Sequence, residues 1–177
     1  VMLVGVWVNI TRRKTAELRA AEDRDLFHTL IEHIPDSIYF KNRESRFVLA
    51  NTATANKLGV PTPADLTGRT DDYFFDQTMS DISRKEEMDI MVTGRPIRAR
   101  LHHETWLHKD DSWRQISKFP WYGRNGELKG IVGISSDVTK LVKTEIKATE
   151  TARILEERNR TLEKEIDLAR EIQFALL

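Results

Sequence analysis

The chain has 177 residues, enough for one hydrophobic core of ordinary size with extensions. Its 28 basic and 28 acidic residues cancel, which argues against a general nucleic-acid-binding protein, because such proteins carry a basic excess. It contains no cysteine, so disulfides, thiolate nucleophiles, cysteine-ligated zinc and cysteinyl-flavin photochemistry are excluded.

The first ten residues, VMLVGVWVNI, are apolar and are followed closely by the basic cluster Arg12-Arg13-Lys14. A spanning helix needs about 20 apolar residues, so this stretch is too short to cross a bilayer. We expect it to be the inner end of a membrane anchor, with the basic cluster on the cytoplasmic side of a bacterial inner membrane. A sticky helix end without a membrane role is the alternative.

In the rest of the chain, residues that favour turns separate short β-rich runs from helical stretches. Pro35 ends the first helical stretch, and Asn125-Gly126 is a strong hairpin signal. In chain order we predict a helix at 15–33, strands at 37–41 and 46–50, helices at 51–58, 73–75 and 77–92, and strands at 97–108, 113–122 and 128–136.

This order places two strands before a helical insert and three strands after it. An α+β domain satisfies it, with a five-stranded antiparallel sheet and its helices on one face. We therefore expect a membrane-proximal helix at 1–22, a globular domain at 23–139 and a helical linker at 140–177.

Several motifs of the globular part resemble those of PAS domains, in order and in spacing. The resemblance implies a sensor or dimerisation module whose sheet cradles a ligand or transmits a signal, and it does not imply catalysis. The motifs are Ile34-Pro-Asp-Ser-Ile-Tyr-Phe-Lys41, Ala50-Asn51, Gly68-Arg-Thr-Asp-Asp-Tyr-Phe74, Glu104-Thr-Trp-Leu-His-Lys-Asp110, Lys118-Phe-Pro120, Asn125-Gly126 and Gly130-Ile-Val-Gly-Ile-Ser-Ser-Asp-Val-Thr139.

By analogy with this family, we expect Asn51, Tyr73, Ile116 and Ser135 to line a pocket. A small organic ligand such as a carboxylate would bind there, and a small core filled by these side chains is the alternative. A haem-binding member would need an axial histidine on the helix at 77–92, which has none, and a flavin photosensor would need a cysteine. We therefore expect neither haem nor a flavin adduct.

Other polar clusters do not predict catalysis or a metal site. His102 and His103 are adjacent on one predicted strand, so their side chains point to opposite faces and cannot chelate one ion together. The acidic pairs at 71–72 and 110–111 lie in turns, where such residues usually cap and solvate the backbone. With no catalytic arrangement in the sequence, we expect a regulatory module and not an enzyme.

The last predicted strand leads directly into a run, 140–177, that contains neither Gly nor Pro and is rich in helix formers. Asp137 and Thr139 lie at this changeover, and both are residue types that accept hydrogen bonds from the free N–H groups of a first helical turn. Val138 between them offers an apolar anchor. We expect Asp137, Val138 and Thr139 to form a junction that couples the sheet to the helix.

Residues suited to a helix seam recur every seven positions along this run, which predicts a parallel homodimeric coiled coil. One long helix that folds back on its own domain is the alternative. The expected d positions are Leu141, Ala148, Leu155, Leu162, Ala169 and Leu176, and the expected a positions include Ala152, Asn159 and Ile166.

The tail, residues 162–177, reads LEKEIDLAREIQFALL and resembles the linker that enters bacterial serine phosphatases of the sporulation stage II E type. This implies a C-terminal phosphatase output domain as the partner of the module. Histidine kinase or cyclase output is the alternative, as is a passive dimerisation spacer without a ligand. The expected partners are a second copy and the output domain, with no nucleic acid.

Overall fold

The structure, a computed structural model, describes residues 2–105 and 110–175. Its helical layer includes two short 3₁₀ helices, η1 and η2. The elements in chain order are α1 (Met2–His33), β1 (Ser37–Asn42), β2 (Phe47–Ala50), α2 (Thr52–Leu58), η1 (Pro63–Leu66), η2 (Asp71–Tyr73), α3 (Gln77–Thr93), β3 (Ile97–Glu104), β4 (Ser112–Tyr122), β5 (Leu128–Asp137) and α4 (Thr139–Ala175).

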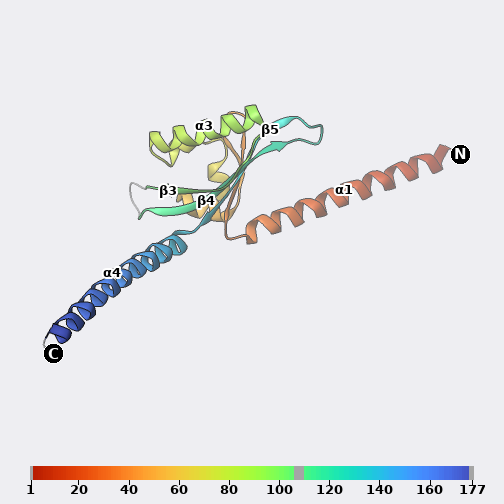
Figure 1. Cartoon of the computed structure of the whole chain (residues 1–177). Coiled ribbons are helices and arrows are strands. Elements are labelled where there is room, and N and C mark those ends of the chain that lie inside the picture. The colour runs from red at the N-terminus through yellow and green to blue at the C-terminus, as the bar shows by residue number, and fades with distance from the viewer. Residues whose placement is uncertain (1, 106–109, 176–177) are drawn as a thin grey trace.

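The strands form one five-stranded antiparallel sheet in the order β2-β1-β5-β4-β3. The segment between β2 and β3 supplies the helices that cover one face, with α3 lying along it (Figure 1). The two long helices, α1 and α4, extend away from this body in different directions (Figure 1). The predicted α+β class and the predicted sheet are confirmed.

The central strand β5 pairs with β1 on one side and β4 on the other, and its register decides which side chains face the helices. Ser135 pairs with Ser37 of β1 and with Ile116 of β4. Gly133, two residues earlier and on the same face, pairs with Tyr39. A Cβ at Gly133 would lie 2.2 Å from the Tyr39 ring, so glycine lets this ring lie across the sheet.

The apolar core is small and lies between β1, β2 and the helical segment. Phe47, Ala50 and Leu66 form its centre, and Leu66 is fully buried. The Phe47 ring meets Tyr39 edge-on with 5.7 Å between ring centroids, and it meets Phe74 similarly at 6.1 Å. Beneath α3 the interior also holds buried polar and charged side chains, among them Lys41, Glu87 and Lys118.

The end of α1 packs on the opposite face of the sheet. The Phe27 ring contacts Phe40 at 6.2 Å between centroids, and Phe40 contacts Trp121 at 5.4 Å. Phe40 alternates with the inward-facing Tyr39 and Lys41, so it points outward. This aromatic row joins α1 to the sheet.

Several element boundaries differ from the expectation. The short helix expected at 73–75 is η2, at Asp71–Tyr73, and η1 was not expected. The first helix begins at Met2 and runs without interruption across the expected boundary between residues 22 and 23. Strand β3 ends at Glu104, where its pairing with Ser112 ends, although the prediction extended to 108. The predicted residues 106–108 lie outside the described part. In α2, Asn51 is not the first helical residue but its N-cap.

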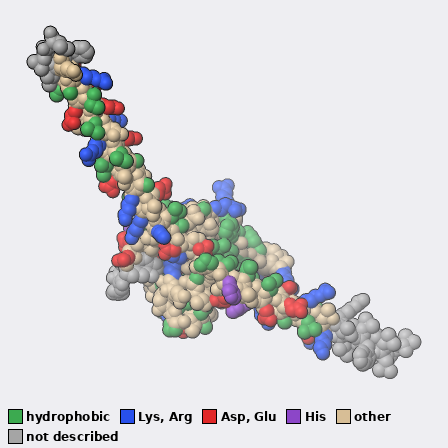
Figure 2. All heavy atoms as spheres, turned by 90° about the horizontal axis from the view of Figure 1, so that it is seen from below, with side chains coloured by type: hydrophobic (Ala, Val, Ile, Leu, Met, Phe, Trp, Pro, Cys, Tyr) green, Lys and Arg blue, Asp and Glu red, His purple; other side chains and the backbone are tan. Residues whose placement is uncertain are grey.

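Helix α4 stands clear of the domain and does not fold back over it (Figure 2). Hydrophobic and charged side chains are mixed along its surface, and Leu141 and Leu155 are more than half exposed. The fold-back alternative is therefore not what the structure shows. Among the described helices, none has an apolar stretch long enough to span a membrane.

Candidate functional site

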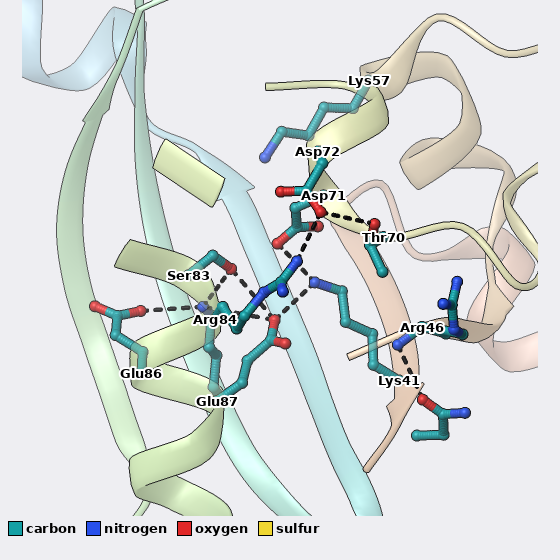
Figure 3. Close-up of polar contacts among 12 residues, drawn as sticks. Lys41, Arg46, Lys57, Thr70, Asp71, Asp72, Ser83, Arg84, Glu86 and Glu87 are labelled. Atoms are coloured by element: carbon teal, nitrogen blue, oxygen red, sulfur yellow. Dashed lines mark hydrogen bonds and ion pairs between the residues drawn. The ribbon is translucent and has the colours of Figure 1, made fainter. Parts of the chain in front are cut away.

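Strand β1 carries a lysine into the interior, where it meets two carboxylates. The Lys41 ammonium lies 2.7 Å from Asp71 of η2 and 2.7 Å from Glu87 of α3 (Figure 3). The side chains of Lys41 and Glu87 are 1% and 0% exposed. The cluster ties η2 and α3 to the sheet through charges that have almost no access to water.

The two carboxylates compensate for the burial of Lys41. Burial alone would lower the pKa of this ammonium, but the charges of Asp71 and Glu87 and their hydrogen bonds outweigh it and raise the pKa. Burial of Asp71 acts to raise its pKa, but the charge of Lys41, the hydrogen bonds from Lys41 and Ser83 and the charge of Lys118 together outweigh it and lower the pKa. Both groups therefore remain charged in the folded protein.

A second lysine, Lys118 of β4, extends this network along α3. Its ammonium donates to Ser83 and to Glu86, each at 3.0 Å. The Ser83 hydroxyl donates to Glu87 at 3.2 Å. Residues three and four apart share one face of a helix, so Ser83, Glu86 and Glu87 present a single polar surface to the sheet.

A third lysine, Lys57 of α2, pairs with a carboxylate on the edge strand β3. Its ammonium lies 2.7 Å from Glu104 and 3.5 Å from the Ser135 hydroxyl. Burial lowers the pKa of Lys57, and the attraction of Glu104 offsets this only in part. Lys57 thus differs from Lys41, whose pKa is raised.

Lys57, Lys118 and several partners of the three lysines line a cavity of about 60 Å³ between α3 and the sheet, whereas Lys41 and Glu87 lie outside its lining. A cavity of 150 Å³ accepts benzene, so this one takes a few water molecules or a ligand of a few heavy atoms. Its polar lining comprises Ser37, Tyr39, Thr54, Lys57, Asp71, Ser83, Glu86, His102, Glu104, Lys118 and Ser135, and its apolar lining comprises Phe47, Leu58, Phe75, Met79, Ile82 and Ile116.

His102 of β3 also lines the cavity. Its Nε2 atom is buried and is among the described polar atoms that have no hydrogen-bond partner. The nearest acid is Glu86, 3.7 Å away. Burial lowers the pKa of His102. As expected from strand geometry, His103 points to the other side of the sheet, where it contacts Asp111 at 3.3 Å.

The four expected pocket residues separate into two groups. Ile116 and Ser135 line the cavity, whereas Asn51 and Tyr73 do not. Tyr73 is 68% exposed, because its side chain points outward from η2, where it stacks with Arg69. Expecting Tyr73 at the pocket was therefore wrong.

Asn51 is fully buried, but its side chain hydrogen-bonds to the backbone of neighbouring segments and does not line the cavity. Its amide donates to the carbonyls of Ile31 and Asp36 at 2.8 and 2.9 Å. Its side-chain oxygen accepts from Ile38 and Thr54, each at 3.0 Å. Asn51 thus joins the end of α1, strand β1 and the start of α2.

The strand-to-helix junction is held by β4. Asp137 Oδ1 accepts from the Thr139 N–H at 2.9 Å, the contact expected of a cap. The Thr139 hydroxyl instead accepts from the Trp113 N–H at 2.9 Å, so it contacts the neighbouring strand and not the helix. Val138 donates its N–H to the Trp113 carbonyl at 2.9 Å.

The expected seam residues lie along α4, where the side chains of Leu155, Leu162 and Ile166 are exposed. The last of them, Leu176, lies outside the described residues. Within the described part of the chain, no group of three or more His, Asp or Glu side chains is arranged to hold a metal ion.

The sequence reasoning missed the buried charges, because charged residues are usually exposed. One signal was available on β4. Arg114, Ile116 and Lys118 are spaced two residues apart, so their side chains lie on the same face of the strand, and the apolar Ile116 marks that face as the inner one. For Lys57 and Glu87, which lie on helices, the sequence contained no comparable signal.

Comparison with known proteins agrees with this architecture. The family model described as a PAS fold matches residues 31–143, more than half of the chain. The methanogenesis regulatory histidine kinase FilI of Methanothrix harundinacea is 23% identical over 129 residues, which cover 73% of this chain and 14% of the kinase. A diguanylate cyclase of Vibrio cholerae is 27% identical over 139 residues, which cover 76% of this chain and 42% of the cyclase. The chain spans less than half the length of these relatives.

Solved structures show the same fold. The VqmA dimer of Vibrio cholerae superposes with a TM-score of 0.59 and 22% identity, covering 68% of this chain and 52% of VqmA. The PAS domain of BvgS from Bordetella pertussis superposes with a TM-score of 0.57 and 23% identity, covering 73% of this chain and 98% of that domain. With the family match over residues 31–143, the chain belongs to the PAS fold family.

Proposed function

We propose that this domain senses a small polar molecule in the cavity between α3 and the sheet and passes the signal through α4. The observation that carries this proposal is the position of Ser135. Ser135 lines the cavity, and α4 begins four residues later, at Thr139. A change at the cavity wall therefore has a short covalent route to the helix.

The lining favours a ligand that carries a hydrogen-bond acceptor, such as a carboxylate. Lys57 is the lysine whose burial is offset only in part, so an acceptor next to it would stabilise its charge. The buried Nε2 of His102 offers a further polar contact. The volume of about 60 Å³ restricts the ligand to a few heavy atoms unless α3 moves.

We further propose that the chain works as a parallel homodimer joined through α4. The exposed leucines at the expected d positions support this, because an isolated 37-residue helix without a packed face has little reason to keep them in water. In the dimer, the paired α4 helices would join two domains, each with its own cavity. The relatives FilI and the diguanylate cyclase are a kinase and a cyclase, so the family serves several outputs.

For the output we propose a C-terminal serine phosphatase, on the similarity of residues 162–177 to the linker of that enzyme class. Kinase and cyclase outputs are the competing candidates. The apolar start followed by Arg12-Arg13-Lys14 supports an anchor that places the domain at the cytoplasmic face of a bacterial inner membrane.

Two experiments test this proposal. Native mass spectrometry of the purified chain should show an added mass of a small molecule, which the Lys57→Met variant loses and the surface variant Lys85→Met keeps. The full-length protein should hydrolyse phosphoserine substrates, and should neither autophosphorylate from ATP nor form a cyclic dinucleotide from GTP. A chain that never retains a ligand, and whose output ignores Lys57→Met, would be a passive spacer.

A further inference from the structure

The acidic side chains that line the cavity, and the adjoining Glu87, are already paired with cations. Each carboxylate has a cation at 3.0 Å or less, namely Lys41 for Asp71 and Glu87, Lys57 for Glu104, and Lys118 and Arg100 for Glu86. An anionic ligand would compete with these acids for the same cations and would be repelled by the acids themselves. The charges around the cavity therefore do not favour an anion.

The Tyr39 hydroxyl, in contrast, has unused hydrogen-bonding capacity. Tyr39 lines the cavity from β1, and its ring lies over Gly133 of β5, where a Cβ would overlap both the ring and the hydroxyl. Within the described part of the chain, no group donates to this hydroxyl or accepts from it. Burial and the charges of Glu87 and Asp71 raise the pKa of Tyr39 well above its usual value, so the hydroxyl keeps its proton and can donate it to a hydrogen bond.

His102 brings a second such group to the cavity from the other side. In the sheet order, β1 and β3 are separated by β5 and β4, so Tyr39 and His102 approach the cavity from different sides. His102 Nε2 lies 3.7 Å from Glu86, which is too long for a hydrogen bond. Burial lowers the pKa of His102, so the ring is neutral near neutral pH, and Nε2 donates or accepts depending on the tautomer.

The described cavity thus combines paired charges with two neutral polar groups that lack a partner. We propose that it binds an uncharged molecule with a small carbonyl group, such as a primary carboxamide, between the Tyr39 hydroxyl and the His102 imidazole. The carbonyl oxygen accepts from Tyr39. The amide suits either tautomer of His102, because it carries both donors and acceptors. Apolar lining residues such as Met79 and Ile116 suit the carbon atoms of the ligand.

This ligand class rests on the proposed sensor function and makes it more specific. Of the acceptors that Lys57 can stabilise, it selects a neutral carbonyl over a carboxylate, because a carboxylate would lie near Glu104 and Glu86, which line the same small space.

NMR titration of the full chain with acetamide and, separately, with acetate tests the proposal. The two probes have nearly the same size and differ in charge, and both are small enough for the cavity. At about pH 7.5, where His102 is neutral, acetamide should shift the backbone amide signals of Tyr39, His102 and Ser135 until they saturate. It should bind about tenfold more tightly than acetate, whose charge would be buried beside the acids.

The variant Tyr39→Phe removes the hydroxyl and keeps the ring over Gly133. It should weaken acetamide binding by about five- to tenfold and leave acetate binding unchanged. His102→Leu should weaken acetamide binding by a similar factor. Tyr73→Phe is the matched control, because Tyr73 is 68% exposed and does not line the cavity. Without ligand, Tyr39→Phe should unfold at the same urea concentration as the parent or a higher one, since the hydroxyl has no partner to lose.

The outcomes separate this ligand class from the sensor function. Acetate that binds as tightly as acetamide would overturn the uncharged class and leave the sensor function standing, because the cavity would still take a ligand. Unchanged acetamide binding in Tyr39→Phe would also overturn the proposal. If neither probe shifts the signals of the lining residues, the ligand class is wrong. The sensor function then falls as well only if native mass spectrometry of the purified chain also shows no bound molecule.

Discussion

The Lys41 ammonium lies 2.7 Å from the Glu87 carboxylate, and neither side chain has contact with solvent. The pair joins the inner face of β1 to the helix that roofs the cavity. A buried ion pair of this kind holds its two elements in one arrangement, since any other arrangement leaves a charge without a partner. It sets the position from which α3 presents Ser83 and Glu86 to the cavity.

Replacing Lys41 by Met should destabilise the domain by about 3–5 kcal/mol, because Asp71 would lose its ammonium partner and Glu87 would keep only Lys118, 4.0 Å away. Urea denaturation measures the free energy of unfolding. Arg84→Met is the control, since it breaks the exposed pair with Asp72 at 2.6 Å and should cost less than about 1 kcal/mol. Equal losses in the two variants would contradict the stabilising role of the buried cluster.

Replacing Asn51 by Ala should cost about 2–4 kcal/mol and leave the cavity lining intact. The variant leaves the Ile38 N–H and the carbonyls of Ile31 and Asp36 without their side-chain partner. The Thr54 N–H loses one acceptor and keeps the Asn51 carbonyl at 3.1 Å. Asn56→Ala, an exposed position on the same helix, should change the free energy of unfolding by less than about 0.5 kcal/mol. A mild effect at Asn51 would mean that water replaces its hydrogen bonds.

His102 should make the domain less stable as the pH falls. Its folded pKa is lowered by burial from the ordinary value of 6.5, and it faces Glu86, Lys118, Arg100 and Glu104. Below pH 6.5 the unfolded chain binds a proton at His102 more readily than the folded chain does. The contribution of His102 to the free energy of unfolding is therefore fully present above pH 6.5 and is lost as the pH falls toward the folded pKa. Denaturation at about pH 7.5 and about pH 5.5 should show a smaller loss for His102→Gln than for the parent. Identical losses would show that His102 does not contribute.

The chain should sediment as a dimer at micromolar concentration. The double variant Leu155→Asp, Leu162→Asp should weaken the dimer, because it places charges at two expected d positions. Leu168→Asp is a matched control, since Leu168 is also exposed in the structure but lies outside the expected a and d positions. Asn159→Leu should retain or increase association while relaxing the oligomeric state. A monomeric parent chain would refute the coiled coil.

Much of this architecture follows from local sequence patterns. The alternation of β4, the hairpin at Asn125-Gly126 and the uninterrupted helix formers after Thr139 specify their elements without help from distant residues. The motifs around Ile34, Gly68 and Gly130 indicated the PAS fold, which the family match confirms. Strand parity alone placed His102 and His103 on opposite faces.

The site was decided by contacts between residues far apart in the chain. Lys41 meets Glu87, and Lys57 meets Glu104, across separations of 46 and 47 residues. Burying a charge is costly unless a partner of opposite charge is present. A local sequence pattern does not predict a partner that lies on another element, far away in the chain. The same limit explains Asn51 and Tyr73: both follow the family motif, but only the packed fold directs one into the interior as a backbone clamp and the other into solvent.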